Sequence, residues 1–250
     1  MSEQTDAVIY HINNAITYAS DLQQKADQSF AAIFAELQHA ADVARGMDVD
    51  QKPDDVIVLP SKSKGIDVSH YQGTIDWQKV KASGVVFAFI KATEGTSLTD
   101  NLFLHNWQTA KAIGIPRGAY HFYRFAADPI AQANFFVSLI NNDLGELSPV
   151  VDVEEDISPV DVSKTIKVFC ERVFELTGRR CMIYTGAWWW TTKRLGGPQP
   201  WAKEYPLWIA AYVSPPPRIP DDWSAWSFWQ YSNKGSINGI SAAVDLDMSA

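Results

Sequence analysis

The stretch VVDVEED at residues 150–156 alternates apolar and acidic side chains before its acids run on. Valine enrichment with a period of two predicts a β-strand, in which successive side chains point to opposite faces. Val151 and Val153 would then share one face of the strand. The opposite face would carry Asp152 and Glu154. Two carboxylates held side by side repel each other and are costly to desolvate, so their placement calls for a chemical reason.

Composition narrows the classes of protein that this chain of 250 residues can belong to. The hydrophobic fraction of 46% and ten tryptophans indicate a globular protein with a substantial core. A net charge of −8 argues against a nucleic-acid partner, because phosphate binding requires a basic surface. No apolar run reaches the roughly 18 residues of a membrane span. The opening MSEQTDAVIY lacks the pattern of a signal peptide, so we expect synthesis in the cytoplasm and another exit route for any action outside it.

The cysteine content also limits the possibilities. Cys170 and Cys181 are the two cysteines of the chain, too few for a disulfide framework or a zinc cluster. Two buried thiols are the simpler interpretation, and a single bridge between them is the alternative. No phosphate-binding glycine-rich loop accompanies the acidic residues of the chain, and we expect no cofactor.

The first part of the chain carries a heptad pattern without glycine or proline. Its seam is spaced 3-4-3-4 and consists of Ile9, Ile12, Ile16, Ala19, Gln23, Ala26, Phe30, Ile33, Leu37, Ala40 and Ala44. Such a seam predicts a helix that buries one side, on a second copy, on a partner or on the rest of the chain. We therefore divide the chain into a helical extension (1–46), a linker (47–64) and a catalytic domain (65–250), with homo-oligomer formation or docking through 6–45.

After residue 64 the chain predicts a barrel. Eight strand candidates occur at 65–70, 85–93, 117–123, 148–155, 181–186, 206–212, 226–232 and 244–249. Helical patterns separate the early ones, at 101–113, 129–141 and 159–177. This alternation is typical of parallel βα units, and eight strands suggest closure into a barrel. Loops rich in proline and tryptophan join the later strands, so we expect an irregular (β/α) barrel with fewer than eight helices.

Polar and aromatic residues gather at the predicted strand ends, where such barrels place their sites. They are Asp67, Glu94, Tyr120, His121, Asp152, Glu154, Tyr184, Thr185, Tyr212, Gln230, Tyr231, Asp245 and Asp247. Each alone has an ordinary explanation, such as a capping aspartate or a hydrogen-bonded core histidine. Together, acids and aromatic rings suit carbohydrate chemistry, since rings stack on sugars and acids transfer protons. A Mg²⁺ or Ca²⁺ site is the rival interpretation of the acids. A serine hydrolase is disfavoured because no G-x-S-x-G elbow occurs.

In chain order, eight segments resemble the successive motifs of glycoside hydrolase family 25, the Chalaropsis-type lysozymes that include phage endolysins. The segments are GIDVSHYQGTIDW, FIKATEG, GAYHFY, PVVDVEE, IYTG, PLWIAAY, WQYS and VDLD. The resemblance covers residue 65 to the end. It implies an N-acetylmuramidase that cleaves the β-1,4 bond between N-acetylmuramic acid and N-acetylglucosamine in peptidoglycan, with an irregular eight-stranded barrel and no metal.

The same resemblance implies roles for nine residues. Glu154 matches the general acid and Asp152 its strand partner, while Asp67 and Asp245 complete an acidic quartet. The positions that line the groove are Tyr120, Tyr184, Trp208, Tyr212 and Gln230. Crowding of like charges would raise the pKa of one acid and keep a proton available near neutral pH. Attack on the anomeric carbon by an enzyme carboxylate and by the substrate's acetamide both stay open.

Two further functions are compatible with parts of the sequence. The helical extension could attach a muramidase to a virion or another partner, which fits phage-type delivery to the cell wall. A non-catalytic glycan-binding barrel would be expected to lack Glu154 or Asp67, and both are present. The absence of a wall-binding repeat leaves the target bacterium undefined.

Overall fold

The computed structural model of the protein describes residues 57, 59–156, 163–191, 195–213, 215 and 217–250. The predictions of a helical extension over 1–46 and of docking through 6–45 lie outside the described residues. Most of the linker predicted over 47–64 lies outside them too.

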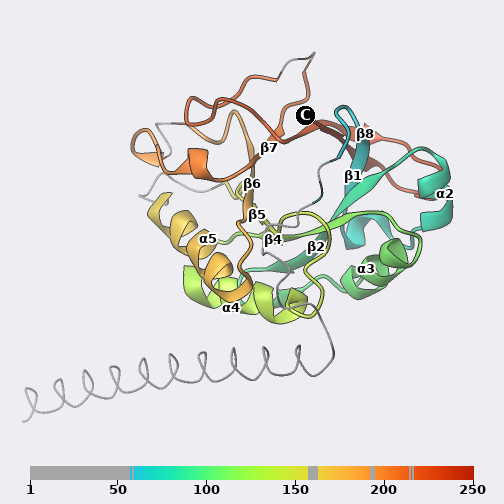
Figure 1. The fold of residues 1–250 in the computed structure, drawn as a ribbon, viewed down its shortest axis with the longest axis horizontal. Coiled ribbons are helices and arrows are strands. Elements are labelled where there is room, and N and C mark those ends of the chain that lie inside the picture. Colours follow the sequence, from blue (N-terminus) through green and yellow to red (C-terminus); the bar gives the residue numbers. More distant parts are fainter. Residues whose placement is uncertain (1–56, 58, 157–162, 192–194, 214, 216) are drawn as a thin grey trace, which may run out of the picture. The chain divides into compact units, whose positions relative to one another are not determined.

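Eight strands form a closed barrel (Figure 1). They are β1 (Lys64–Val68), β2 (Phe87–Glu94), β4 (Arg117–Phe122), β5 (Val150–Asp152), β6 (Met182–Gly186), β7 (Leu207–Ala210), β8 (Phe228–Gly235) and β9 (Val244–Ser249). Their order is β1-β9-β8-β7-β6-β5-β4-β2, and pairing of β1 with β2 closes the ring. The two-residue strand β3 (Leu98–Thr99) pairs only with β2. Each barrel strand overlaps one predicted segment, so the predicted fold class is confirmed.

The last strand runs against the others. Among the eight barrel strands, all neighbouring pairs that do not include β9 are parallel, whereas β9 is antiparallel to both β8 and β1. The start of β9 therefore lies beside the carboxyl ends of the other strands. Asp245, its second residue, pairs with Asp67 near the end of β1. This reversal brings the two carboxylates to one mouth of the barrel.

The helices are few and unevenly placed. They are η1 (His70–Gln72), α2 (Trp77–Ala82), α3 (Phe103–Ala112), α4 (Pro129–Ile140), α5 (Ser163–Thr177) and η2 (Ala202–Glu204). The sequence explains why α4 begins where it does. Asp128 Oδ1 accepts a hydrogen bond from Ala131 N as the N-cap, and Pro129 occupies the first turn. Between β6 and β9, the described residues include η2 and the helical residue Leu195, and no longer helix. The predicted irregular second half is thus confirmed.

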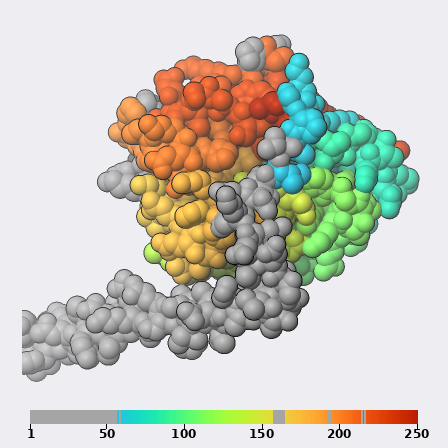
Figure 2. Space-filling model, in the orientation of Figure 1, coloured from blue at the N-terminus to red at the C-terminus, as the bar shows by residue number. Residues whose placement is uncertain are grey.

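Two apolar clusters lie on opposite faces of the strands. Val151 and Val153 belong to the outer cluster, which packs between the barrel and α3, α4 and α5. The interior cluster consists of Phe87, Phe89, Leu147, Val150, Met182, Tyr184, Trp208, Ala210 and Phe228. The face assignment predicted from the alternation at 150–156 is therefore confirmed. Figure 2 shows the early elements (cyan to green) and the late ones (orange to red) covering separate parts of the surface.

Ring packing fills the barrel beneath its mouth. Phe89 stacks on Trp208 with ring centres 4.2 Å apart. A Cβ atom at Gly118 would lie 2.6 Å from the Phe89 ring, so the neighbouring strand needs glycine there. Among the described residues, the rings fill the interior beneath the pocket that lies at the strand ends.

The segment just before β1 is attached to the barrel. Lys62 N donates to Ser249 O over 3.0 Å, and Ser249 Oγ donates to Pro60 O over 2.7 Å. Leu59 packs against the interior cluster. Because Ser249 ends the antiparallel strand β9, these contacts lie at the end of the barrel opposite the mouth. The domain boundaries themselves stay a prediction.

Candidate active site

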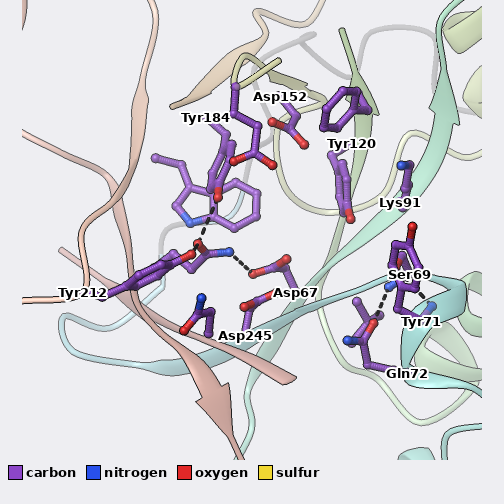
Figure 3. A pocket seen from close by; sticks show the side chains of 16 residues that line it. Asp67, Ser69, Tyr71, Gln72, Lys91, Tyr120, Asp152, Tyr184, Tyr212 and Asp245 are labelled. Atoms are coloured by element: carbon purple, nitrogen blue, oxygen red, sulfur yellow. Dashed lines mark hydrogen bonds between the residues drawn. The ribbon is translucent and has the colours of Figure 1, made fainter. Parts of the chain in front are cut away.

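A pocket of about 300 Å³ opens at the mouth of the barrel. Figure 3 shows side chains from several strands turned into it. All nine residues predicted for the site line it: Asp67, Tyr120, Asp152, Glu154, Tyr184, Trp208, Tyr212, Gln230 and Asp245. Seven others share the lining: Val68, Ser69, Tyr71, Gln72, Lys91, Phe122 and Asn233.

The end of β5 supplies two carboxylates. Asp152 is the last residue of the strand, and Glu154 follows two positions later on the same side. Asp152 is 5% exposed, and its Oδ1 has no hydrogen-bond partner among the described residues. A buried acceptor without a partner is costly, which is typical of a site that waits for a ligand's donor.

Burial raises the pKa of both carboxyl groups of this pair. The pKa of Glu154 is raised by burial first and by the charge of Asp245 second, against the opposing effects of Lys91 and the Tyr184 hydroxyl. The pKa of Asp152 is raised well above its ordinary value, again by burial first and then by Glu154. Loss of solvation is therefore the main cause, and the like-charge repulsion expected from the sequence is a smaller one.

A second acidic group faces the first across the pocket (Figure 3). Burial raises the pKa of Asp245 to about 6. The pKa of Asp67 is raised well above its ordinary value, by burial first and then by the charges of Asp247 and Asp245. Asp247 is fully buried and accepts a hydrogen bond from Trp208 Nε1 over 2.9 Å. The pocket thus gathers carboxyl groups that hold protons at a pH where exposed ones are ionised.

Gln230 links both sides of the site. Its Nε2 donates to Asp67 Oδ2 over 2.7 Å. Its Oε1 accepts from the hydroxyls of Tyr184 and Tyr212, over 2.9 and 2.8 Å (Figure 3). These three bonds fix the amide and orient both phenol rings.

The predicted groove aromatics differ in position. Trp208 is 2% exposed and forms the floor, with its ring stacked beneath the pocket. Tyr120 and Tyr184 line the walls, and burial raises the pKa of each hydroxyl well above its ordinary value. Tyr212 is 51% exposed and stands at the rim. Tyr212 therefore offers the most open ring surface of this group.

Lys91 is a site residue that the sequence reasoning did not single out. It is buried in β2, and its Nζ lies 2.7 Å from Glu94 Oε2 and 4.9 Å from the centre of the Phe122 ring. Its charge favours the ionised forms of Asp152 and Glu154. The available signal was a lysine directly after the apolar run FAFI, which did not show to which side of the strand the lysine points.

An ion-pair network beside the pocket holds the turn after β5. Arg124 Nε donates to Glu94 Oε1 over 3.0 Å, and its NH1 group donates to Glu155 Oε1 over 2.7 Å. Glu155 Oε2 also accepts from Phe125 N over 2.8 Å. Glu94 and Glu155 thus serve this network and are not among the pocket-lining residues. The network anchors the residue directly after Glu154.

Other polar residues at strand ends belong to the core. His121 is fully buried between Thr93 Oγ1 at 2.8 Å and Gln132 Oε1 at 3.2 Å, and burial lowers its pKa to about 4. Thr185 Oγ1 donates to Val153 O over 2.9 Å. These contacts agree with the ordinary structural explanation that the sequence also allowed.

Three further observations concern the cysteines, metal ligands and membrane-spanning helices. Cys170 and Cys181 are buried free thiols, and no bridge joins them. Within the described ranges, no three His, Cys, Asp or Glu side chains are grouped so that they could hold a metal ion. No helix in the same ranges is both long and apolar enough to cross a membrane.

A closed barrel that presents buried carboxyl groups of raised pKa and aromatic rings at its strand ends defines a glycosidase-like protein. Comparison with known proteins specifies the family. The profile of "Glycosyl hydrolases family 25" matches residues 66–240, and the chain belongs to this family.

Named relatives and solved structures agree with that assignment. Lysozyme M1 of Streptomyces globisporus is 38% identical over 208 residues, which cover 77% of this chain and 70% of the relative. An N,O-diacetylmuramidase of Chalaropsis sp. is 31% identical over 73% of this chain and 95% of its own. The crystal structure of a bacterial lysozyme from Streptomyces coelicolor superposes with a TM-score of 0.68 at 37% identity, covering 76% and 93% of the two chains.

Proposed function

We propose that this protein is a peptidoglycan hydrolase that cleaves the β-1,4 bond between N-acetylmuramic acid and N-acetylglucosamine. The observation that carries the proposal is the buried Glu154–Asp152 pair in an aromatic-lined pocket. The family and its relatives named lysozyme and N,O-diacetylmuramidase support the same substrate. Its place of action would be the bacterial cell wall.

Glu154 acts as the general acid. Its raised pKa keeps the carboxyl group protonated nearer to neutral pH than an exposed glutamate. The proton passes to the glycosidic oxygen as the bond to the anomeric carbon breaks, and the N-acetylglucosamine hydroxyl leaves. Water then supplies a hydroxyl to that carbon and returns one proton to Glu154, which balances the reaction.

Asp152 supports the positive charge that develops at the sugar. Its unpartnered Oδ1 provides an acceptor for the N–H of the substrate's acetamido group. A carboxylate in this position orients the acetamide and stabilises positive charge through space. Lys91 lies nearby, and its charge favours the ionised forms of both Asp152 and Glu154.

Asp67, Gln230 and the two tyrosines form the opposite wall. The bond from Gln230 to Asp67 and the bonds from Tyr184 and Tyr212 to Gln230 hold this wall in one arrangement. A wall fixed before the substrate arrives needs no reorganisation during reaction. Asp245, with a pKa of about 6, adds a charge that depends on pH and raises the pKa of Glu154.

The products test the proposal directly. Purified peptidoglycan is digested, the new reducing ends are reduced with borohydride, and the fragments are analysed by mass spectrometry. Muramicitol ends are expected. Glucosaminitol ends would identify a glucosaminidase, and free amines without new reducing ends would identify an amidase. Because the acid mechanism uses only side chains, a chelator should leave the rate unchanged.

The heptad pattern gives the proposal a second part. We expect residues 6–45 to bury their apolar seam on another copy of the chain or on a partner. Light scattering on the full chain tests self-association. An oligomer supports pairing through the seam, and a monomer contradicts it.

A further inference from the structure

Tyr71 stands at the rim of the pocket with an unusually open ring. It belongs to η1, the short turn that follows β1, and lines the same pocket as the carboxyl groups. Its exposed fraction of 75% exceeds that of Tyr212. Figure 3 shows the two tyrosines on opposite sides of the pocket. A single exposed aromatic is common on protein surfaces, so its meaning depends on how the ring is held.

The turn that carries Tyr71 is anchored to buried groups. The backbone N of His70 donates to Asp100 Oδ2 over 2.9 Å, and its Nδ1 lies 2.7 Å from the same oxygen. Asp100 is itself buried and accepts a third bond from Leu102 N. His70 is therefore fixed in both backbone and ring.

A reciprocal cap closes the turn on its other side. Ser69 Oγ accepts from Tyr71 N over 3.3 Å, and Gln72 Oε1 accepts from Ser69 N over 2.9 Å. Gln72 Nε2 donates to Ala243 O over 3.1 Å, which ties the turn to the segment before β9. The backbone that presents Tyr71 is thus held from two directions.

The ring of Tyr71 rests on this fixed support. Its centre lies 4.1 Å from that of the His70 imidazole, with the planes tilted by 36°. Its hydroxyl makes no hydrogen bond to any other described residue. One side of the ring is therefore braced, while most of its surface and its hydroxyl are open to solvent. Tyrosine offers contact area of this kind with little loss of side-chain entropy.

We infer that Tyr71 is a substrate-binding residue that stacks on a sugar unit of the glycan strand, across the pocket from Tyr212. The inference deepens the proposed function and rests on it, because the ligand is the same polymer. A braced ring next to catalytic carboxyl groups provides an apolar platform for the face of a pyranose and a hydroxyl for its edge. Its contribution is to hold the strand, with little change in the chemical step.

The test separates binding from chemistry. Tyr71→Ala should raise KM for soluble glycan strands about 3- to 10-fold, in line with aromatic stacking energies, and leave kcat within about two-fold. Tyr71→Phe and Tyr71→Trp should stay near wild type because each keeps a planar ring. The matched control is Phe174→Ala, which removes an exposed aromatic outside the pocket lining and should change neither constant.

Binding without turnover gives an independent readout. In a Glu154→Gln background, Tyr71→Ala should weaken co-sedimentation with purified peptidoglycan by a similar factor. Tyr71→Leu keeps apolar volume without a planar ring, so it should bind as weakly as Tyr71→Ala. It serves as the test variant if Tyr71→Ala unfolds.

Several results would overturn the inference. Unchanged KM and unchanged co-sedimentation in Tyr71→Ala would show that Tyr71 does not bind the glycan strand. A fall in kcat with a lowered melting temperature and unaltered KM would show a structural role instead. Failure of the proposed function is distinct from these: the wild type would then yield no muramicitol ends, whatever residue occupies position 71.

Discussion

Replacing Asp245 with asparagine should stabilise the fold at neutral pH. Burial raises the pKa of this carboxyl group from 3.8 to about 6. A raised pKa means that the folded state binds the proton more tightly than the unfolded state. The contribution of Asp245 to stability is therefore greatest below about pH 4 and is lost as the pH rises towards and through about 6. Asparagine cannot ionise, so the variant avoids this loss.

The shift sets the size of the effect. A change of about two pKa units corresponds to about 3 kcal/mol as an upper limit. Asp245 is only partly buried, so solvent screens its charge. We expect Asp245→Asn to raise the free energy of unfolding by about 1–2 kcal/mol at pH 7.5 and by much less at pH 4. The side-chain hydrogen bond with Asp67 lowers the pKa of Asp245, so its loss acts in the opposite direction and keeps the expected gain below the upper limit.

Urea unfolding at the two pH values measures this difference, provided that the slope of the transition is unchanged. Asp143→Asn is the control of opposite sign. Burial opposes ionisation of Asp143, but bonds from Arg117 and Lys111 outweigh it and lower its pKa. That variant should lose stability at pH 7.5, and the loss should shrink as the pH falls below about 4. An Asp245→Asn protein no more stable than wild type at pH 7.5, or equally stabilised at both pH values, would refute the reasoning.

Two other substitutions probe the supports around the site. Glu155→Gln removes the ion pair with Arg124 and should loosen the turn that carries Glu154. We expect kcat to fall about 3- to 10-fold with little change in KM or melting temperature. Steady-state kinetics measures this, and an unchanged kcat would contradict it. Arg117→Met leaves Asp143 and Glu146 without their buried partner. The free energy of unfolding, measured by urea titration, should fall by about 2–4 kcal/mol. A variant as stable as wild type would show that these ion pairs contribute little to stability.

The alternation at 150–156 could be interpreted from sequence because one face of β5 is apolar and the other acidic. In β2 both faces are buried, so the run FAFIKATE gave no sign that Lys91 points inward with Phe87 and Phe89. Strand ends could be expected to meet, and the predicted residues do line one pocket. The sequence could not show that Glu94 turns aside to Arg124, because that depends on a partner thirty positions away.

Loops limited the prediction in a similar way. Tyr71 lies in a turn whose position depends on Asp100 and on the backbone of Ala243, contacts that no local pattern reveals. The reversal of β9 also came from the fold, since alternation does not give strand direction. Its acids reach the mouth only because the strand runs that way.

The most direct measurement is turnover of purified peptidoglycan by Glu154→Gln. The substitution keeps the size of the side chain and removes the proton that the glycosidic oxygen needs. General acid catalysis is worth about 10²–10⁴-fold, so kcat should fall by at least about 100-fold while the melting temperature stays close to that of wild type. Glu171→Gln, an exposed position on α5, is the matched control and should keep full activity. A correctly folded Glu154→Gln protein with near-native turnover would contradict the assignment of Glu154 as the acid.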